Sequence, residues 1–168
     1  RLRQERLHEE SIDYGMSARA YVSTVLDLIK LHDFKSVLDY GCGKGTLRDL
    51  IFGRAGLEMA NRIREYDPAI HDKMHPAEAA EFVVCIDVLE HIEPEKLDFV
   101  LRHIRQMGWR MLFATVAMIP ATKTLADGRN AHLIVESQQW WFERLLLWWD
   151  MRACSGTNKG FVFMGVPK

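Results

Sequence analysis

The chain has few cysteines, no surplus of charge of either sign and no long apolar run. Its three cysteines stand far apart, at positions 42, 85 and 154, which argues against a disulfide framework and against a zinc site of paired cysteines. Reduced thiols at this spacing are expected of a cytoplasmic protein. No stretch reaches the roughly 18 apolar residues that span a bilayer, so we predict a soluble protein without a membrane segment.

The balanced charge narrows the range of partners. The sequence has 22 basic and 23 acidic residues, so no broad basic surface is expected to make nucleic acid an obligatory partner. A local basic patch would still allow one. The length of 168 residues suits a single domain over residues 1–168, which would bury roughly two thirds of the surface of its unfolded chain.

The most informative segment is residues 37–45, Val-Leu-Asp-Tyr-Gly-Cys-Gly-Lys-Gly. Its apolar start predicts a buried strand that places Asp39 at the carboxyl end. Gly41, Gly43 and Gly45, called the glycine turn below, allow a sharp turn and leave space for a bound ligand. A strand, a glycine turn and a helix also open the dinucleotide-binding fold. That fingerprint, however, needs glycine at position 46, where this chain has threonine.

Hydrophobic periodicity divides the chain into alternating helices and strands. Helices are predicted at 17–31, from Thr46 to near Gly53 or Gly56, at 94–107 and from Ser137 onward, with Ser17 and Ser137 as candidate N-caps. Strands are predicted at 36–39, 62–66, 82–86, 110–117, 148–153 and 161–166, the last two joined by a hairpin turn at 155–160. Residues 118–135 lack periodicity and are expected to form a long loop.

This alternation predicts an α/β fold, Rossmann-like and doubly wound, whose mostly parallel sheet carries a C-terminal antiparallel hairpin strand. Ligands of such sheets bind beyond the carboxyl ends of the strands. Asp39, Asp67, Asp87 and the loop 118–135 are all expected at that edge.

Three blocks in this order resemble the class I S-adenosylmethionine-dependent methyltransferases. They are the glycine turn with its preceding acid, the segment Glu65-Tyr66-Asp67, and Asp87-Val88-Leu89-Glu90-His91. The resemblance implies methyltransferase activity with S-adenosyl-L-methionine as cofactor. Only 14 residues, 68–81, separate the second acid from the next strand, too few for the family's helix, third strand and helix. We therefore expect the third strand to be missing or vestigial.

The resemblance also implies a set of cofactor-binding residues. Asp67 is expected to bind the ribose hydroxyls, with Glu65 as the fallback, because a carboxylate accepts hydrogen bonds from both hydroxyls of a diol. Asp39 is expected to orient the glycine turn and the ammonium group of the cofactor. The full predicted set is Tyr14, Asp39, Gly41, Gly43, Gly45, Asp67, Asp87 and Val88.

His91 is the candidate general base, with Glu90 beside it, for an acceptor that must lose a proton. The alternative is that His91 packs the turn before Pro94 while Glu90 holds that turn. A further variant uses Glu90, His91 and His132 as metal ligands, as a similar block does in small-RNA 2′-O-methyltransferases. The prediction adopted here contains no metal.

The predicted reaction moves a methyl group to an oxygen or nitrogen atom of a small polar acceptor. Two alternatives remain, a catalytically inert binding module with the cofactor fold and a metal-dependent RNA 2′-O-methyltransferase. Cys42 lacks an adjacent histidine and is not expected to be a nucleophile. The tryptophans at 140, 141, 148 and 149 are expected in the core or on a surface for a partner, which would allow an oligomer.

Overall fold

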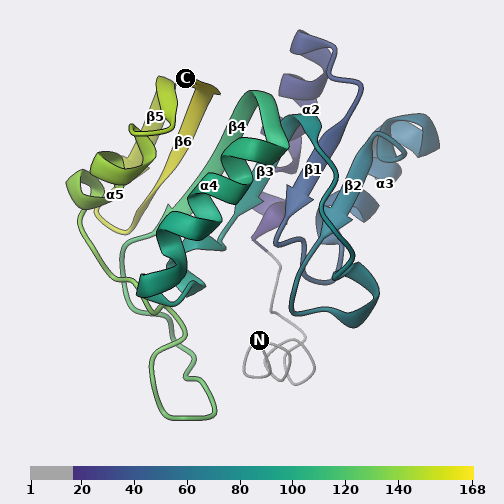
Figure 1. Cartoon of the computed structure of the whole chain (residues 1–168). Helices are drawn as coiled ribbons and strands as arrows, with labels where there is room; N and C mark the ends of the chain where they lie inside the picture. Colours follow the sequence, from purple (N-terminus) through teal and green to yellow (C-terminus); the bar gives the residue numbers. More distant parts are fainter. Residues whose placement is uncertain (1–16) are drawn as a thin grey trace.

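The computed structural model describes residues 17–168 of the chain. A six-stranded sheet of order β2-β1-β3-β4-β6-β5 forms its centre (Figure 1). The first four strands along the chain run parallel, whereas β6 is antiparallel to both of its neighbours, β4 and β5. The strands are β1 (Val37–Tyr40), β2 (Ile63–Tyr66), β3 (Ala80–Ile86), β4 (Gly108–Ala117), β5 (Trp149–Thr157) and β6 (Gly160–Pro167).

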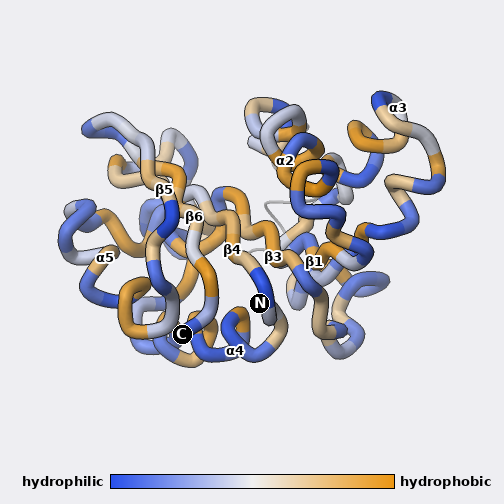
Figure 2. The backbone as a smooth tube through the Cα atoms, turned by 90° about the horizontal axis from the view of Figure 1, so that it is seen from above, coloured by the Kyte–Doolittle hydropathy of each residue, from blue (hydrophilic) through white to orange (hydrophobic). Residues whose placement is uncertain are grey.

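Helices cover both faces of the sheet. Those of residues 17–168 are α2 (Ala18–His32), α3 (Thr46–Ala60), α4 (Leu97–Met107) and α5 (Gln138–Leu145), with short 3-10 turns η1 (His71–Lys73), η2 (Leu89–His91) and η3 (Pro94–Lys96). Figure 2 shows α2 and α3 on one side of the row of strands and α4 and α5 on the other. In the part of the chain described, no helix is long and apolar enough to cross a membrane.

Strand β3 links the two core layers. Phe82 and Val84 pack in the layer under α2 and α3, whereas Val83 and Cys85 pack in the layer under α4 and α5. Successive side chains of a strand point to opposite faces, so a strand covered on both faces needs an uninterrupted apolar run. All four side chains are fully buried, and the prediction of a central parallel strand is confirmed.

The predicted Rossmann-like fold is confirmed, and so is the loss of its third strand. Residues 67–79 contain the single turn η1 and no strand, which leaves β2 at the edge of the sheet. This position explains how a strand carries arginine. Arg64 of this edge strand is exposed, and its guanidinium pairs with the carboxylate of Glu78 at 2.8 Å.

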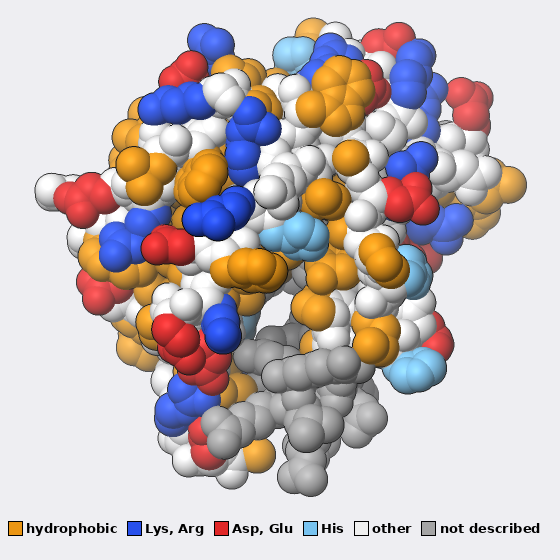
Figure 3. Space-filling view, viewed as in Figure 1, with side chains coloured by type: hydrophobic (Ala, Val, Ile, Leu, Met, Phe, Trp, Pro, Cys, Tyr) orange, Lys and Arg blue, Asp and Glu red, His pale blue; other side chains and the backbone are white. Residues whose placement is uncertain are grey.

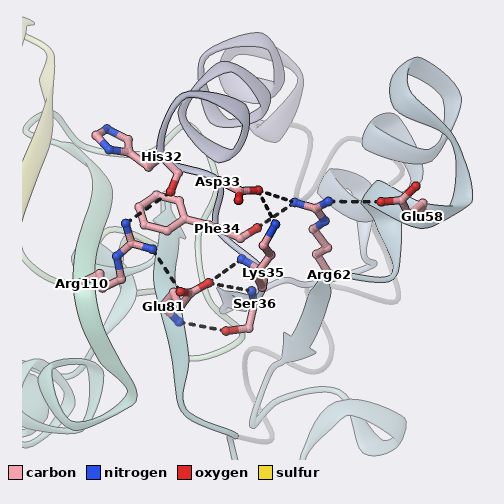
Figure 4. A network of polar contacts seen from close by, with 9 residues as sticks. All are labelled: His32, Asp33, Phe34, Lys35, Ser36, Glu58, Arg62, Glu81 and Arg110. Carbon is pink, nitrogen blue, oxygen red and sulfur yellow. Dashed lines mark hydrogen bonds and ion pairs between the residues drawn. The ribbon is translucent and has the colours of Figure 1, made fainter.

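A polar network fastens the amino ends of the strands (Figure 4). The carboxylate of Glu81, at the start of β3, accepts hydrogen bonds from the backbone N–H groups of Lys35 and Ser36 and from Arg110 of β4. Arg62, which precedes β2, donates to the Phe34 carbonyl at 3.2 Å. The network therefore joins the α2–β1 connection to three strands at the end of the sheet opposite their carboxyl ends.

Three local expectations were wrong. Helix α3 does not end at Gly53 or Gly56; it breaks at Gly56 and continues to Ala60. The hairpin turn is shorter than predicted, because β5 extends to Thr157 and the turn holds only residues 158–159. Ser17 makes no capping hydrogen bond, whereas Ser137 caps α5 by accepting from the Trp140 N–H as predicted.

The two glycines of α3 give a matched test of backbone geometry. Gly56 has φ 81° and ψ 179°, a conformation essentially restricted to glycine, whereas Gly53 is helical, and a Cβ atom at either would meet nothing within 4 Å. We expect Gly53→Ala to stabilise the protein by about 0.5–1 kcal/mol and Gly56→Ala to destabilise it by about 1–3 kcal/mol. Urea unfolding of both variants checks this, and equal effects would contradict the break at Gly56.

Candidate active site

A cavity of about 500 Å³ opens where the parallel strands end. Figure 3 shows the surface hollowed at this edge of the molecule, with hydrophobic side chains around the opening. Its walls come from the ends of β1, β3 and β4, the start of α2, the connection after β2 and the loop 118–135. Polar lining residues include Ser17, Asp39, Asp67, Asp87, His91, Lys123, His132 and Lys159.

The glycine turn forms one wall through backbone conformations that favour glycine. Gly41, Gly43 and Gly45 have φ angles of 75°, 53° and 84°. Gly41 and Gly43 line the cavity. Gly45 does not line it, and a Cβ atom there would collide with the Glu65 carboxylate. Packing within the protein, rather than ligand access, therefore requires glycine at position 45.

Asp67 joins the end of β2 to the glycine turn. Its side chain is 5% exposed and lines the cavity. Oδ2 accepts a hydrogen bond from the Gly43 N–H at 2.9 Å, and Oδ1 accepts one from the Ala69 N–H at 2.8 Å. These bonds fix the carboxylate at the cavity wall, and each oxygen retains a further lone pair.

Lys73 is a site residue that the sequence did not reveal. Its ammonium group donates to the Gly43 carbonyl at 3.1 Å and pairs with the Glu65 carboxylate at 3.4 Å. Because Asp67 holds the N–H of Gly43, both backbone polar groups of Gly43 are bound by the connection that follows β2. The available signal was a lone lysine in the shortened connection, which no motif distinguishes.

Asp39 stands beside these groups at the end of β1, and it is 5% exposed. Burial raises the pKa of its carboxyl to about 7; the nearby Glu65 and Asp67 add to this effect, while Lys73 opposes it. At neutral pH Asp39 is therefore close to the midpoint between its neutral and charged forms. A cation bound in the cavity near Asp39 would favour the charged form.

Asp87 follows β3 in a left-handed conformation, with φ 58°. Its N–H donates to the Thr115 hydroxyl at 3.0 Å, and its Oδ2 accepts from the Ser17 hydroxyl at 2.7 Å. Burial opposes ionisation, but hydrogen bonds with Glu90 and Ser17, and the nearby His91, lower the pKa of Asp87. The hydroxyl expected to cap α2 thus orients a carboxylate in the cavity instead.

Glu90 is fully buried behind the cavity wall and does not line the cavity. Its Oε1 accepts from the Ala117 N–H at 2.6 Å, and its backbone carbonyl accepts from the N–H groups of Leu133 and Ile134. Burial, followed by the charge and hydrogen bond of Asp87, raises its pKa well above the ordinary value. A neutral Glu90 accounts for this shift, and its hydrogen bonds to the end of β4 and to the loop 118–135 suit a role in holding these segments together.

His91 and His132 both line the cavity and contact each other, with ring centroids 4.8 Å apart. The Nδ1 atom of His91 lies 2.8 Å from the Ala131 carbonyl, and that of His132 lies 2.6 Å from the Ile119 carbonyl. A carbonyl only accepts, so Nδ1 carries the proton in both neutral rings and the lone pair lies on Nε2. Asp87 stands with these two rings, in the place where the sequence suggested Glu90.

The remaining candidates lie as follows. Tyr14 is outside the described residues. Val88 lines the cavity, whereas no tryptophan does, and Trp141 and Trp149 are buried in the core. Burial raises the pKa of the Cys42 thiol, so this cysteine is a poor nucleophile.

Comparison with known proteins identifies the family. A family model described as a methyltransferase domain matches residues 14–157 of the chain. No curated protein sequence matches this chain.

Three solved structures illustrate the likeness of the fold. The N-methyltransferase NodS from Bradyrhizobium japonicum WM9, in complex with S-adenosyl-L-homocysteine, has a TM-score of 0.60 and 13% identity, over 99% of this chain and 97% of that one. Magnesium protoporphyrin IX methyltransferase from Synechocystis PCC 6803 has a TM-score of 0.62 and 15% identity, over 91% and 84%. For an rRNA methylase from Escherichia coli the TM-score is 0.57, the identity 14% and the coverage 91% and 66%.

The family model covers more than half of the chain, and the similar structures share its Rossmann-like sheet. The resemblance predicted from the sequence is thus confirmed, and the chain belongs to the methyltransferase-domain family of class I S-adenosylmethionine-dependent methyltransferases.

Proposed function

We propose that the protein moves a methyl group from S-adenosyl-L-methionine to an oxygen or nitrogen atom of a small polar acceptor. The observation that carries the proposal is one shared cavity. It joins a glycine turn fixed by a buried carboxylate, Asp67, to a polar wall of Asp87, His91 and His132. Its volume of about 500 Å³ suits small-molecule ligands.

The residues present fit the cofactor. Gly41 and Gly43 present backbone without side chains to the cavity. The lone pairs that Asp67 retains would accept the two ribose hydroxyls, and ionised Asp39 would bind the ammonium group. Pro68 supplies apolar surface for the adenine in place of the missing third strand.

The chemistry asks little covalent help of the protein. When bound, S-adenosyl-L-methionine would supply a methyl group on a sulfonium centre, and the acceptor would displace it in line, the bond to sulfur breaking as the bond to the acceptor forms. Alignment of the acceptor and exclusion of water by the cavity walls provide the acceleration. For a hydroxyl acceptor, His91 is the proposed base, because the Ala131 carbonyl holds its Nδ1 and directs the lone pair to Nε2.

Replacement of Asp67 tests the cofactor site. Asp67→Asn removes the charge and one of the acceptors, so we expect affinity for S-adenosylhomocysteine to fall by about 10- to 100-fold, as for a hydrogen bond to a charged group. Isothermal titration calorimetry measures it. The control Asp72→Asn changes an exposed acid of the same connection and should leave the affinity unchanged. Equal affinities of the two variants would contradict the ribose assignment.

Asp39 predicts how this affinity depends on pH. Its folded pKa of about 7 exceeds its ordinary 3.8, so without ligand the unfolded chain loses the proton first and stability falls as pH rises from about 4 to 7. A bound ammonium group reverses the preference and expels the proton. We expect affinity for S-adenosylhomocysteine to rise between about pH 5 and 7, by at most about tenfold per unit, and then to level off.

Calorimetry in buffers of different ionisation enthalpy would detect the released proton. The slope should disappear in Asp39→Asn, which has no proton to release. A slope that persists in this variant would assign the pH dependence to another group.

Glu90 is proposed as a positioning residue, and its neutral state makes a matched pair informative. Glu90→Gln keeps the shape of the side chain and an acceptor for the Ala117 N–H, so we expect its free energy of unfolding to change by less than about 1 kcal/mol. Glu90→Ala leaves that N–H without its partner and opens a cavity, with an expected loss of about 2–4 kcal/mol. Urea unfolding compares them. A large loss in Glu90→Gln would show that the native group is charged.

A further inference from the structure

We propose that Asp87, His91 and His132 form a site for one divalent transition-metal ion, with Zn²⁺ as the best candidate. The proposal deepens the proposed function, on which its catalytic role rests, by assigning these three residues to the acceptor side of the reaction. It also replaces two earlier expectations, Asp87 as a cofactor contact and Glu90 as a metal ligand.

The first support is convergence. Asp87, His91 and His132 each offer one ligand atom, and these atoms lie within 4.8 Å of one another. Among residues 17–168 this is the one group of three or more His, Cys, Asp or Glu side chains that meets this geometry. All three line the cavity, although they come from the end of β3, from η2 and from the loop 118–135.

The second support is the way the rings are held. The Ala131 and Ile119 carbonyls accept from the Nδ1 atoms of His91 and His132, at 2.8 and 2.6 Å. Ligating histidines usually donate their other ring N–H to a carbonyl or carboxylate, which fixes the tautomer and the direction of the lone pair. The loop thus places two imidazoles in the tautomer that binds a metal through Nε2.

The third support is the backbone conformation of Asp87 and the way its carboxylate is held. Asp87 has φ 58°, and the Thr115 hydroxyl accepts from its N–H while Ser17 donates to its Oδ2. Backbone strain gathers at functional sites, and carboxylate ligands are themselves hydrogen-bonded. The Ser17 hydroxyl holds Oδ2 of this carboxylate, whose oxygens keep lone pairs for an ion.

Two imidazoles and one carboxylate suit Zn²⁺, which in catalytic sites takes three protein ligands and keeps a fourth position open. Bonds of about 2.0–2.2 Å require the ligand atoms to move closer than they stand here, so binding would involve side-chain rotations. The open position would take an oxygen of the acceptor and lower the pKa of its hydroxyl group, whose proton then leaves to solvent. With the ion bound, His91 would be a ligand, and the ion would take over the activation of the acceptor hydroxyl that is otherwise proposed for His91 as base.

Calorimetric titration with Zn²⁺ alone, followed by metal analysis after dialysis, tests the site. We expect one equivalent per chain in the wild type. Affinity should fall by about tenfold or more in His132→Ala and in Asp87→Asn, since each loses one of three ligands. His71→Ala, which removes an exposed histidine outside the cavity, is the matched control and should bind as the wild type does. Circular dichroism confirms that the variants fold.

Two results would overturn the proposal. One is the absence of a stoichiometric site in the wild type, and the other is equal Zn²⁺ affinity in all four proteins, which indicates adventitious surface binding. Thermal shifts with S-adenosylhomocysteine separate this failure from failure of the proposed function. If Asp87 belongs to the metal site, Asp87→Asn loses Zn²⁺ but keeps that shift; loss of the shift with Zn²⁺ affinity intact would return Asp87 to the cofactor.

Discussion

The site depends on how Gly43 is held. Its N–H donates to Asp67 and its carbonyl accepts from Lys73. Both partners belong to the short connection that follows β2. A peptide group fixed at both polar atoms cannot turn without breaking two charge-assisted hydrogen bonds, each stronger than a neutral one. The left-handed turn therefore keeps its shape although three glycines give it little intrinsic stiffness. The same contacts align β1 with β2 at their carboxyl ends.

A second fixed point lies beneath the polar wall. Buried Glu90 binds the end of β4 through Ala117 and the long loop through the N–H groups of Leu133 and Ile134. Two different kinds of interaction thus support the two sides of the cavity. On the glycine side, charges and backbone groups are partly exposed to a ligand; behind the histidines, a neutral carboxyl group secures segments that are far apart in sequence. The loop that carries His132 is thereby positioned without regular secondary structure of its own.

Much of this architecture was predictable from local patterns. The apolar run 82–86 and the glycine turn each contain their own structural cause, and the count of residues between Asp67 and β3 was enough to exclude a further strand. Contacts between distant segments were not predictable. The Ser17 hydroxyl meets Asp87 across 70 positions, and the sequence could not reveal that Glu90 is buried while Asp87 faces the cavity. The predicted end of α3 near Gly56 was wrong, because this single residue outside helical geometry kinks the helix without ending it.

Because the third strand is missing, β2 is an edge strand, and an exposed edge favours aggregation unless the sequence opposes it. A bare strand edge offers backbone groups to any other chain, and such edges are where proteins join into aggregates. Here the exposed Arg64 lies on the edge strand, paired with Glu78 and hydrogen-bonded to the Ala79 carbonyl. An incoming strand would have to strip water from that ion pair and break its contacts. Arg64, an unusual residue for a strand, thus protects β2 against pairing with another chain at the edge where the third strand is missing.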